Sequence, residues 1–396
     1  MVGAVSERPS AEGRTALCLN IGSSSIKFAL FTERPEGEER IGDGAIEGVR
    51  QTDGRAWVRS AQGRQELPAG LRDDSGALTL AFDLAERVRG GPPDLVGHRV
   101  VHGGARHTAP TRVDAALLDD LDRLTPLAPL HLPAAVGGMR AAAARWPRST
   151  QVACFDTAFH ASLPEIAWRL PLPDALVGDQ VRRYGFHGLS YEYIMSVLGP
   201  RPPSRVVLAH LGNGASLVAV KDGRAIDTTM GFTPTGGIMM GTRSGDLDPG
   251  ALTFLARQHG LSPDDLDRIC ERESGLLAVG GAADMRTLIE RAPMSSKAAL
   301  AVSMFAYGVR KAIGALAAAL GGLDLLVFTG GIGEHAAEVR TEACRGLEMF
   351  GVELDSDANS RRADAISRSS SRCSVRVIPT DEDVMIARHS WRITRP

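Results

Sequence analysis

The sequence of 396 residues lacks the marks of several common protein classes. Its five cysteines are odd in number and show no Cys-x-x-Cys spacing, which argues against a disulfide framework or a zinc site. Its net charge of −2 argues against a surface that follows nucleic-acid phosphates, because such surfaces are basic. No Gly-Lys dipeptide occurs, so the P-loop of many nucleotide-binding proteins is excluded.

Long apolar runs are also absent. The most apolar stretch, 312–328, is broken by Gly321, Gly322 and Asp324, and we expect no membrane span. The first residues carry Glu and Arg where a signal peptide needs an apolar core, so 1–14 is interpreted as a loose N-terminal tail. These features predict a cytoplasmic protein with no membrane or nucleic-acid partner.

Glycine, by contrast, is abundant, at 44 residues. Many of these glycines lie in polar turns that follow apolar strands, at 20–25, 212–216, 236–245 and 330–334. Glycine is common in tight turns for backbone reasons alone. Four such turns at strand ends, where backbone N–H groups favour phosphate, together predict a nucleotide-binding protein.

Two of these turns belong to hairpins of similar pattern. GSSSI at 22–26 and NGASL at 213–217 are offset by about half the chain, which predicts a duplicated fold. Strands alternate with helices elsewhere: apolar spacings of three and four predict a helix over 294–320, followed by a strand at 323–328. The fold class is therefore α/β, with two comparable lobes.

Charged side chains in glycine-rich or strand-end positions are the candidates for chemistry. Arg99 and Arg243 could each form a structural ion pair, but two converging arginines suit a phosphoryl transfer between anions. Asp156 follows an apolar strand, a place that suits a carboxylate that organises Mg²⁺ or takes part in the reaction. The acids at 381–383 open a helix and are either favourable helix N-terminal charges or the source of a Mg²⁺ ligand. His98 and His102 lie on a strand, too far apart to share a metal ion.

Ten motifs occur in order along the chain. They are Asn20–Lys27, GHRVVHGG, LAPLH, FDTAFH, YGFHG, HLGNG, DTTMGFTP, MMGTRSGDLDP, GIGE and IPTDE. This ordered set resembles the acetate kinase family, which belongs with sugar kinases, heat-shock ATPases and actin. The resemblance implies two duplicated actin-like (ribonuclease H-like) lobes around a nucleotide cleft. The expected first lobe is 15–157 with 383–396, which would hold the acyl substrate and Mg²⁺, and the second is 158–382.

The resemblance also implies roles for individual residues. The catalytic residues would be Asp156, His187, Arg243, Arg99 and His131. The acyl substrate would contact Arg99, Val101, Leu130, Phe186 and Pro234. ATP would contact Lys27, Ser23, Ser25, His210, Leu211, Gly212, Asn213, Gly214, Asp284, Met285, Arg286, Gly331, Ile332, Gly333, Glu334 and His335. Asn20 and Glu382 would bind Mg²⁺, or Mn²⁺ in its place.

The implied reaction is a reversible in-line transfer of the γ-phosphoryl group of ATP to acetate, giving acetyl phosphate and ADP. A propionate or butyrate kinase of the same family is the first alternative, and a nucleotide-dependent clamp ATPase is the second. The family is homodimeric, which implies a dimer formed through the second lobe. Several residues depart from the commonest family pattern, around the expected acyl and adenine sites: Leu132, Ala135, Leu189, Tyr191, Thr235, Gly236, His335 and Asp381.

Overall fold

The computed structural model describes residues 13–22, 24–68, 70, 73–129 and 131–395. The chain divides into two compact units, the first made of residues 1–158 and 381–396 and the second of residues 159–380. The second unit is therefore an insertion into the first. These boundaries lie within two residues of those expected from the sequence, but Glu382, which was expected in the second lobe, clusters with the first unit. Of the expected N-terminal tail, residues 1–12 lie outside the described residues.

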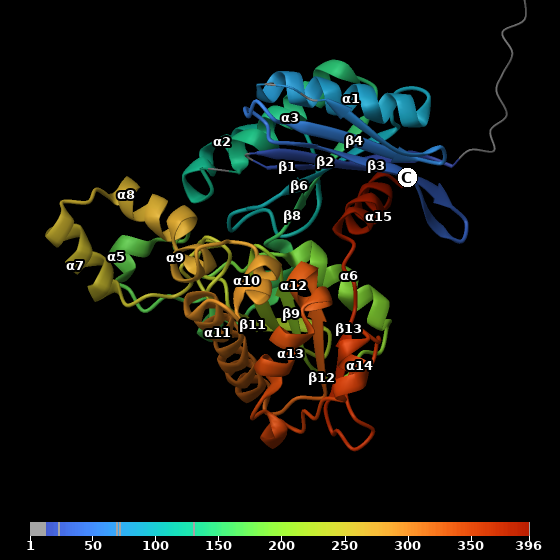
Figure 1. Cartoon of the computed structure of the whole chain (residues 1–396). Helices are drawn as coiled ribbons and strands as arrows, with labels where there is room; N and C mark the ends of the chain where they lie inside the picture. Colours follow the sequence, from blue (N-terminus) through green and yellow to red (C-terminus); the bar gives the residue numbers. More distant parts are fainter. Residues whose placement is uncertain (1–12, 23, 69, 71–72, 130, 396) are drawn as a thin grey trace, which may run out of the picture. The chain divides into compact units, whose positions relative to one another are not determined.

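An eight-stranded sheet with the order β5-β4-β3-β2-β1-β6-β8-β7 organises the first unit. Its strands are β1 (Thr15–Ile21), β2 (Ser25–Arg34), β3 (Gly37–Glu47), β4 (Arg55–Ser60), β5 (Gly63–Pro68), β6 (Leu95–Val100), β7 (Thr111–Arg112) and β8 (Thr150–Phe155). The helices packed with it are α1 (Asp74–Arg89), α2 (Ala115–Arg123), α3 (Leu132–Arg145) and α15 (Glu382–Thr394). Helices α1 and α3 lie on one face of the sheet and α15 lies on the other (Figure 1).

A five-stranded sheet with the order β11-β10-β9-β12-β13 organises the second unit. Its strands are β9 (Arg205–Leu211), β10 (Ala215–Lys221), β11 (Arg224–Thr228), β12 (Leu325–Thr329) and β13 (Ser374–Val377). Its helices are α4 (Glu165–Trp168), α5 (Asp174–Val177), α6 (Gly188–Leu198), α7 (Pro249–His259), α8 (Pro263–Arg268), α9 (Gly275–Gly280), α10 (Met285–Arg291), α11 (Ser296–Leu320), α12 (Gly330–His335), α13 (Ala337–Cys344) and α14 (Ser356–Ser360).

The two sheets share one topology. In the first, β1, β2 and β3 form an antiparallel meander, and β6 and β8 are added in parallel beside β1. In the second, β9, β10 and β11 form the meander, and β12 and β13 are added in parallel beside β9. The order β3-β2-β1-β6-β8 thus repeats as β11-β10-β9-β12-β13. The repeat explains the two similar hairpins of the sequence, because each forms the first two strands of its sheet.

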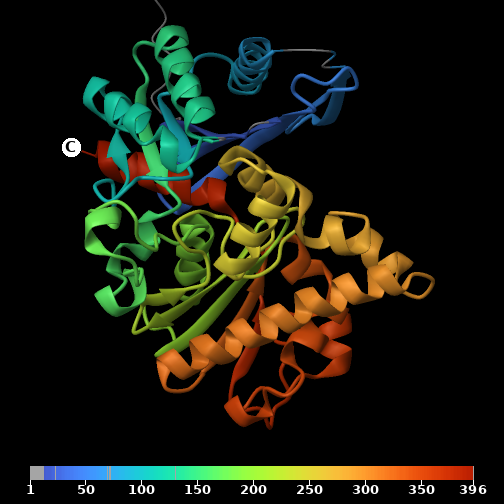
Figure 2. The ribbon, with the colours of Figure 1, turned by 90° about the vertical axis from the view of Figure 1, so that its left-hand side faces the viewer.

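The long helix α11 lies across the second sheet (Figure 2). The hydroxyl of Ser295 caps its N-terminus by accepting from the N–H of Ala298, and Gly321 ends it in a left-handed conformation with φ of 74°. Phe305, Val309 and Ile313 lie on its buried face, as the spacing predicts. Among the described residues it is the one helix long and apolar enough to span a membrane, by length and composition alone, and its buried face packs on β9, β10 and β11.

Candidate functional site

In the first unit, the partly buried Arg99 forms an ion pair with the buried Asp156. Arg99 extends from β6 and Asp156 follows the neighbouring parallel strand β8, so strand pairing brings the two side chains together. Nε and Nη2 of Arg99 donate to Oδ2 of Asp156 at 3.0 and 2.7 Å. Burial works against the charge of Arg99, but Asp156 and Glu382 outweigh it and raise the pKa of the guanidinium. Nη1 takes no part in this pair, so an anionic ligand could approach it.

The N-terminus of α15 carries three successive carboxylates. Asp381 caps the helix by accepting from the N–H of Val384, and Glu382 lies 3.6 Å from Nε of Arg99. Nη2 of Arg40, on β3, donates to both oxygens of Asp381 at 2.7 Å, and Nη1 lies 3.6 Å from Asp383. Burial raises the pKa of Asp383 to about 6. Arg40 thus pairs with Asp381 and Asp383, whereas Glu382 lies beside Arg99.

The oxygen donors of this unit suit Mg²⁺. Asn20 lies on β1, and α15, which Glu382 opens, packs against that strand. Among the described residues, no group of three or more His, Cys, Asp or Glu side chains could hold a metal ion. Mg²⁺ commonly takes only one or two carboxylates from the protein and completes its shell with water and substrate phosphates. An amide and a carboxylate oxygen therefore fit this ion better than they fit a structural metal.

In the second unit, Arg243 and His187 both approach the β9–β10 turn. The N–H of Gly212 donates to the carbonyl of Gly214 at 3.1 Å and closes this turn. A Cβ atom at position 214 would lie 3.3 Å from Nη1 of Arg243 and 3.3 Å from Nε2 of His187. Nη1 of Arg243 also donates to the carbonyl of Pro234 at 3.2 Å. The turn that was expected to meet phosphates thus lies beside two side chains that can donate to an anion.

The backbone and ring of His187 are both constrained. His187 has a φ of 60°, a left-handed conformation that is uncommon for residues other than glycine, and it immediately precedes α6. Its ring stacks on that of His210, with centroids 4.4 Å apart. Nδ1 of His187 lies 2.8 Å from Oγ of Ser216, and Nδ1 of His210 lies 2.8 Å from Oγ of Ser190. Strained backbone often occurs at functional sites, because only the surrounding structure can maintain it.

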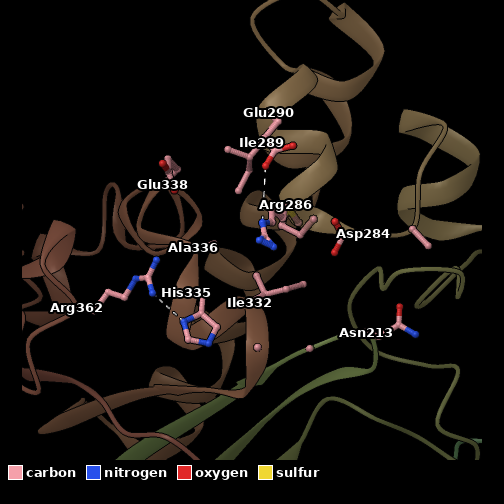
Figure 3. A pocket seen from close by; sticks show the side chains of 14 residues that line it. Asn213, Asp284, Arg286, Ile289, Glu290, Ile332, His335, Ala336, Glu338 and Arg362 are labelled. Atoms are coloured by element: carbon pink, nitrogen blue, oxygen red, sulfur yellow. Dashed lines mark hydrogen bonds and ion pairs between the residues drawn. The ribbon is translucent and has the colours of Figure 1, made fainter. Parts of the chain in front are cut away.

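A pocket of about 910 Å³ lies wholly within the second unit, between α10, α12 and the β9–β10 turn (Figure 3). Eight of the residues expected to contact ATP line it: Gly212, Asn213, Asp284, Met285, Arg286, Gly331, Ile332 and His335. Asp284 also caps α10, because its carboxylate accepts from the N–H of Thr287 at 2.9 Å. The volume is that of a small-molecule site, and the glycines at its floor allow a ligand to approach the backbone closely.

Other residues expected at the site are not among those that line this pocket. Gly333 is buried in α12, and the carboxylate of Glu334 accepts from the backbone N–H groups of Gly330 and Thr380 at 2.9 and 3.2 Å, a structural role. Lys27 is exposed on β2, Ser25 begins that strand, and His131 immediately precedes α3. Ser23 and Leu130 lie outside the described residues.

The expected apolar contacts of the acyl group belong to both units. Val101 follows β6 in the first unit, whereas Phe186 and Pro234 belong to the second. Phe186 is buried, and its carbonyl accepts from Nε2 of His160 at 2.9 Å. Leu211, which was expected near ATP, is a buried residue at the end of β9. Each of these residues is thus described within the unit to which it belongs.

The pocket also contains residues that the sequence analysis missed. They are Ala283, Ile289, Glu290, Ala336, Glu338 and Arg362. Arg362 donates to Nδ1 of His335 at 3.2 Å and has a left-handed φ of 56° (Figure 3). It belongs to the polar segment 356–372, whose composition resembles an ordinary surface loop, so no motif marks it. Ile289 and Glu290 lie one helical turn after Met285 and could have been found from helix periodicity.

Some departures from the family pattern have a local explanation. Leu132 and Ala135 replace amides. Both are buried on α3, and Leu132 belongs to the apolar cluster between α3 and β8. Leu189 is likewise buried, at 1% exposure, in the first turn of α6. Asp381 replaces an amide at the N-cap of α15, where the paired Arg40 compensates its charge. These substitutions exchange polar support for apolar packing or an ion pair.

Comparison with known proteins gives one consistent result. The sequence model of the acetokinase family matches residues 15–388. Acetate kinase from Rhodopseudomonas palustris strain TIE-1 is 45% identical to the chain over 390 residues, which cover 95% of this chain and 98% of that protein. Acetate kinase from Methylocella silvestris is 42% identical over 95% of this chain and 97% of that protein.

Solved structures agree with the sequence comparisons. The crystal structure of acetate kinase from Porphyromonas gingivalis superposes with a TM-score of 0.87 and 36% identity, over 97% of this chain and all of that one. A propionate kinase from Francisella tularensis superposes with a TM-score of 0.90 and 34% identity, over 96% and 99% of the two chains. The predicted α/β fold with two duplicated actin-like lobes is therefore confirmed.

Proposed function

The chain belongs to the acetokinase family, and we propose that it transfers the γ-phosphoryl group of ATP to acetate, giving acetyl phosphate and ADP, in a reversible reaction. The approach of Arg243 and His187 to the glycine turn after β9 is the observation that carries this proposal. Transfer between two anions needs positive charge and hydrogen-bond donors around the phosphoryl group more than it needs a base. That turn has both.

The carboxylate of acetate is the acceptor in this proposal. A carboxylate is already deprotonated at neutral pH, so no strong general base is required. Arg99 would bind it, since a guanidinium pairs well with carboxylates and stays charged. Asp156 would orient Arg99 and act on the reacting groups through position rather than by taking a proton. Val101, Phe186 and Pro234 would contact the methyl group.

Arg243 and His187 would then stabilise the charge of the phosphoryl group during transfer, with His131 nearby. Mg²⁺, or Mn²⁺ in its place, would be held by Asn20 and Glu382, and it would neutralise phosphate charge. Adenosine would occupy the pocket beside α10 and α12, and the turn at His210–Gly214 would meet the phosphates, with Lys27 and Ser25 also facing them. The pocket's size and position support this assignment.

Acyl phosphate formation from acetate, propionate and butyrate, trapped with hydroxylamine, tests the proposal. We expect ATP- and Mg²⁺-dependent acyl phosphate, with acetate the best acceptor. A parallel assay of ADP release without any carboxylate separates a kinase from a clamp ATPase. ADP release that is independent of added carboxylate, without acyl phosphate, would overturn the proposal.

Propionate is the second candidate substrate, favoured by the structural likeness to the propionate kinase. One methylene in an apolar pocket changes specificity by only about 10–200-fold. The ratio of kcat/KM for propionate and acetate therefore decides between the two, and a ratio above one would reassign the substrate.

We also propose that the protein is a cytoplasmic homodimer that associates through its second unit. Leu300, Met304 and Tyr307 form an exposed apolar stripe on α11, each at least 44% exposed. Such stripes are typical of interfaces. Light scattering of the wild type should give twice the chain mass, and Met304→Glu should shift the mass toward that of one chain. A wild type with the mass of one chain would contradict this assembly.

A further inference from the structure

A buried row of polar groups links α6 to His187. Oγ of Ser216, on β10, lies 2.8 Å from Nδ1 of His187 and 2.5 Å from the hydroxyl of Tyr191. Ser216 and Tyr191 are fully buried, and His187 is 9% exposed. Buried polar groups of this kind fix the geometry of their neighbours, because an unpaired group in the core costs about 1–3 kcal/mol.

The hydrogen atoms of this row are few. A serine hydroxyl has one hydrogen to donate and so does a tyrosine hydroxyl, whereas a neutral imidazole has one hydrogen on either nitrogen. If Ser216 donates to Nδ1 of His187, its oxygen can accept from Tyr191, and the ring hydrogen of His187 lies on Nε2. Nε2 is the atom that faces the glycine turn at Gly214.

We infer that Tyr191 and Ser216 are positioning residues, which hold His187 with its hydrogen on Nε2, aimed at the transferring phosphoryl group. The inference rests on the proposed function for the role of His187, and on the geometry alone for the hydrogen-bond row. Tyr191 donates to Ser216, Ser216 donates to His187, and His187 donates to a phosphoryl oxygen. Neither Tyr191 nor Ser216 touches the reacting atoms.

The ring of His187 is held in position by its neighbours. Ser216 pairs with His210 across the β9–β10 ladder, and the ring of His210 stacks on that of His187. The stack limits rotation of the His187 ring, and the left-handed backbone at His187 sets the direction of its side chain. With the ring held in this way, Nδ1 faces Ser216 and Nε2 faces the glycine turn, so the hydroxyl hydrogens of Ser216 and Tyr191 decide which nitrogen carries the ring hydrogen. The stack and the backbone thus set the position of the ring, and the hydrogen bonds of Ser216 and Tyr191 set its tautomer.

Tyr191→Phe is the main test, because it removes one oxygen and keeps the ring that packs in the core. We expect kcat to fall about tenfold, with KM for ATP and acetate changed less than about twofold. Ser216→Ala should lower kcat by at least as much. Tyr184→Phe is the matched control: Tyr184 is also buried, and its hydroxyl donates to the backbone carbonyl of Gln180 at 2.8 Å. It should keep kcat within about twofold of the wild type.

The tautomer itself is measured by NMR of protein with ¹⁵N-labelled histidine, where His187→Gln identifies the signals. The wild type should show the hydrogen of His187 on Nε2, and Tyr191→Phe should show a mixture or the other tautomer. A wild-type hydrogen on Nδ1, or an unchanged tautomer and kcat in both Tyr191→Phe and Ser216→Ala, would overturn the inference. If the wild type forms no acyl phosphate, the proposed function fails, and the tautomers of the wild type and Tyr191→Phe alone then decide the inference.

Discussion

Replacing Arg243 should slow phosphoryl transfer while leaving nucleotide binding nearly unchanged. Its guanidinium lies beside the glycine turn and donates to the carbonyl of Pro234. Arg243→Ala should lower kcat about 10³-fold or more, because charge that develops in transfer loses its partner. The dissociation constant of ADP, measured by calorimetry, should change less than about threefold. Near-normal turnover in this variant would contradict the role of Arg243.

The buried histidines should shape the pH dependence of stability. Burial lowers the pKa of His160 to about 4, from an unfolded value near 6.5. The unfolded chain therefore binds a proton in this window that the folded chain does not, so stability is full above about pH 6.5 and falls toward about pH 4. His160 should account for about 2 kcal/mol of the loss between about pH 7 and about pH 5.

Urea unfolding measures the free energy of unfolding at each pH. In His160→Gln, the loss of that free energy between about pH 7 and about pH 5 should be smaller by about 2 kcal/mol. His259→Gln, at an exposed position near the end of α7, is the control and should leave the slope as it is. An unchanged slope in His160→Gln would show that His160 is not neutral in the fold. His98, bonded to Gln151 at 2.7 Å and with its pKa lowered by burial to about 4, should behave like His160.

At the scale of elements, the start of α15 depends on an ion pair from a distant strand. Arg40→Met would leave Asp381 and Asp383 beside Glu382 without their partner, and should cost about 1–3 kcal/mol of unfolding free energy. Adding Asp381→Asn should recover part of this loss, because an asparagine still caps the helix but carries no charge.

Urea unfolding of the single and double variants measures this coupling. Arg388→Met is the control, since Arg388 joins the same helix to the same strand through its ion pair with Glu38. A double variant less stable than Arg40→Met would contradict the explanation.

The elements differ in how well the sequence predicts them. The hairpins of β1–β2 and β9–β10 and the long helix α11 were predictable, because apolar periodicity and turn residues are local signals. The pairing of Arg99 with Asp156 was not, since it depends on strands far apart in sequence lying side by side. Arg362 and Arg40 were missed for the same reason: each lies in a segment of ordinary polar composition, and only the folded chain brings it to its partner.

At the scale of the whole chain, the two units should respond differently to nucleotide. The pocket is built entirely from the second unit. ADP alone should therefore slow hydrogen exchange of amides around Asn213, Asp284 and Gly331, because a ligand stabilises the part that binds it. Amides of β4 and β5 in the first unit should exchange as before. Equal protection of both units by ADP would contradict a pocket confined to the second.

The insertion of residues 159–380 into the first unit also has a consequence for synthesis. Helix α15 follows every strand of both sheets in the sequence, and it supplies Ile386 to the face of the first sheet that β1 and β6 help to form. The second unit can complete its sheet as soon as β13 has left the ribosome. The first unit, although its strands are translated before those of the second, keeps one face uncovered until residues 381–396, which follow the second unit in the sequence, have been translated. The unit whose strands are translated first is thus the unit that completes its fold second.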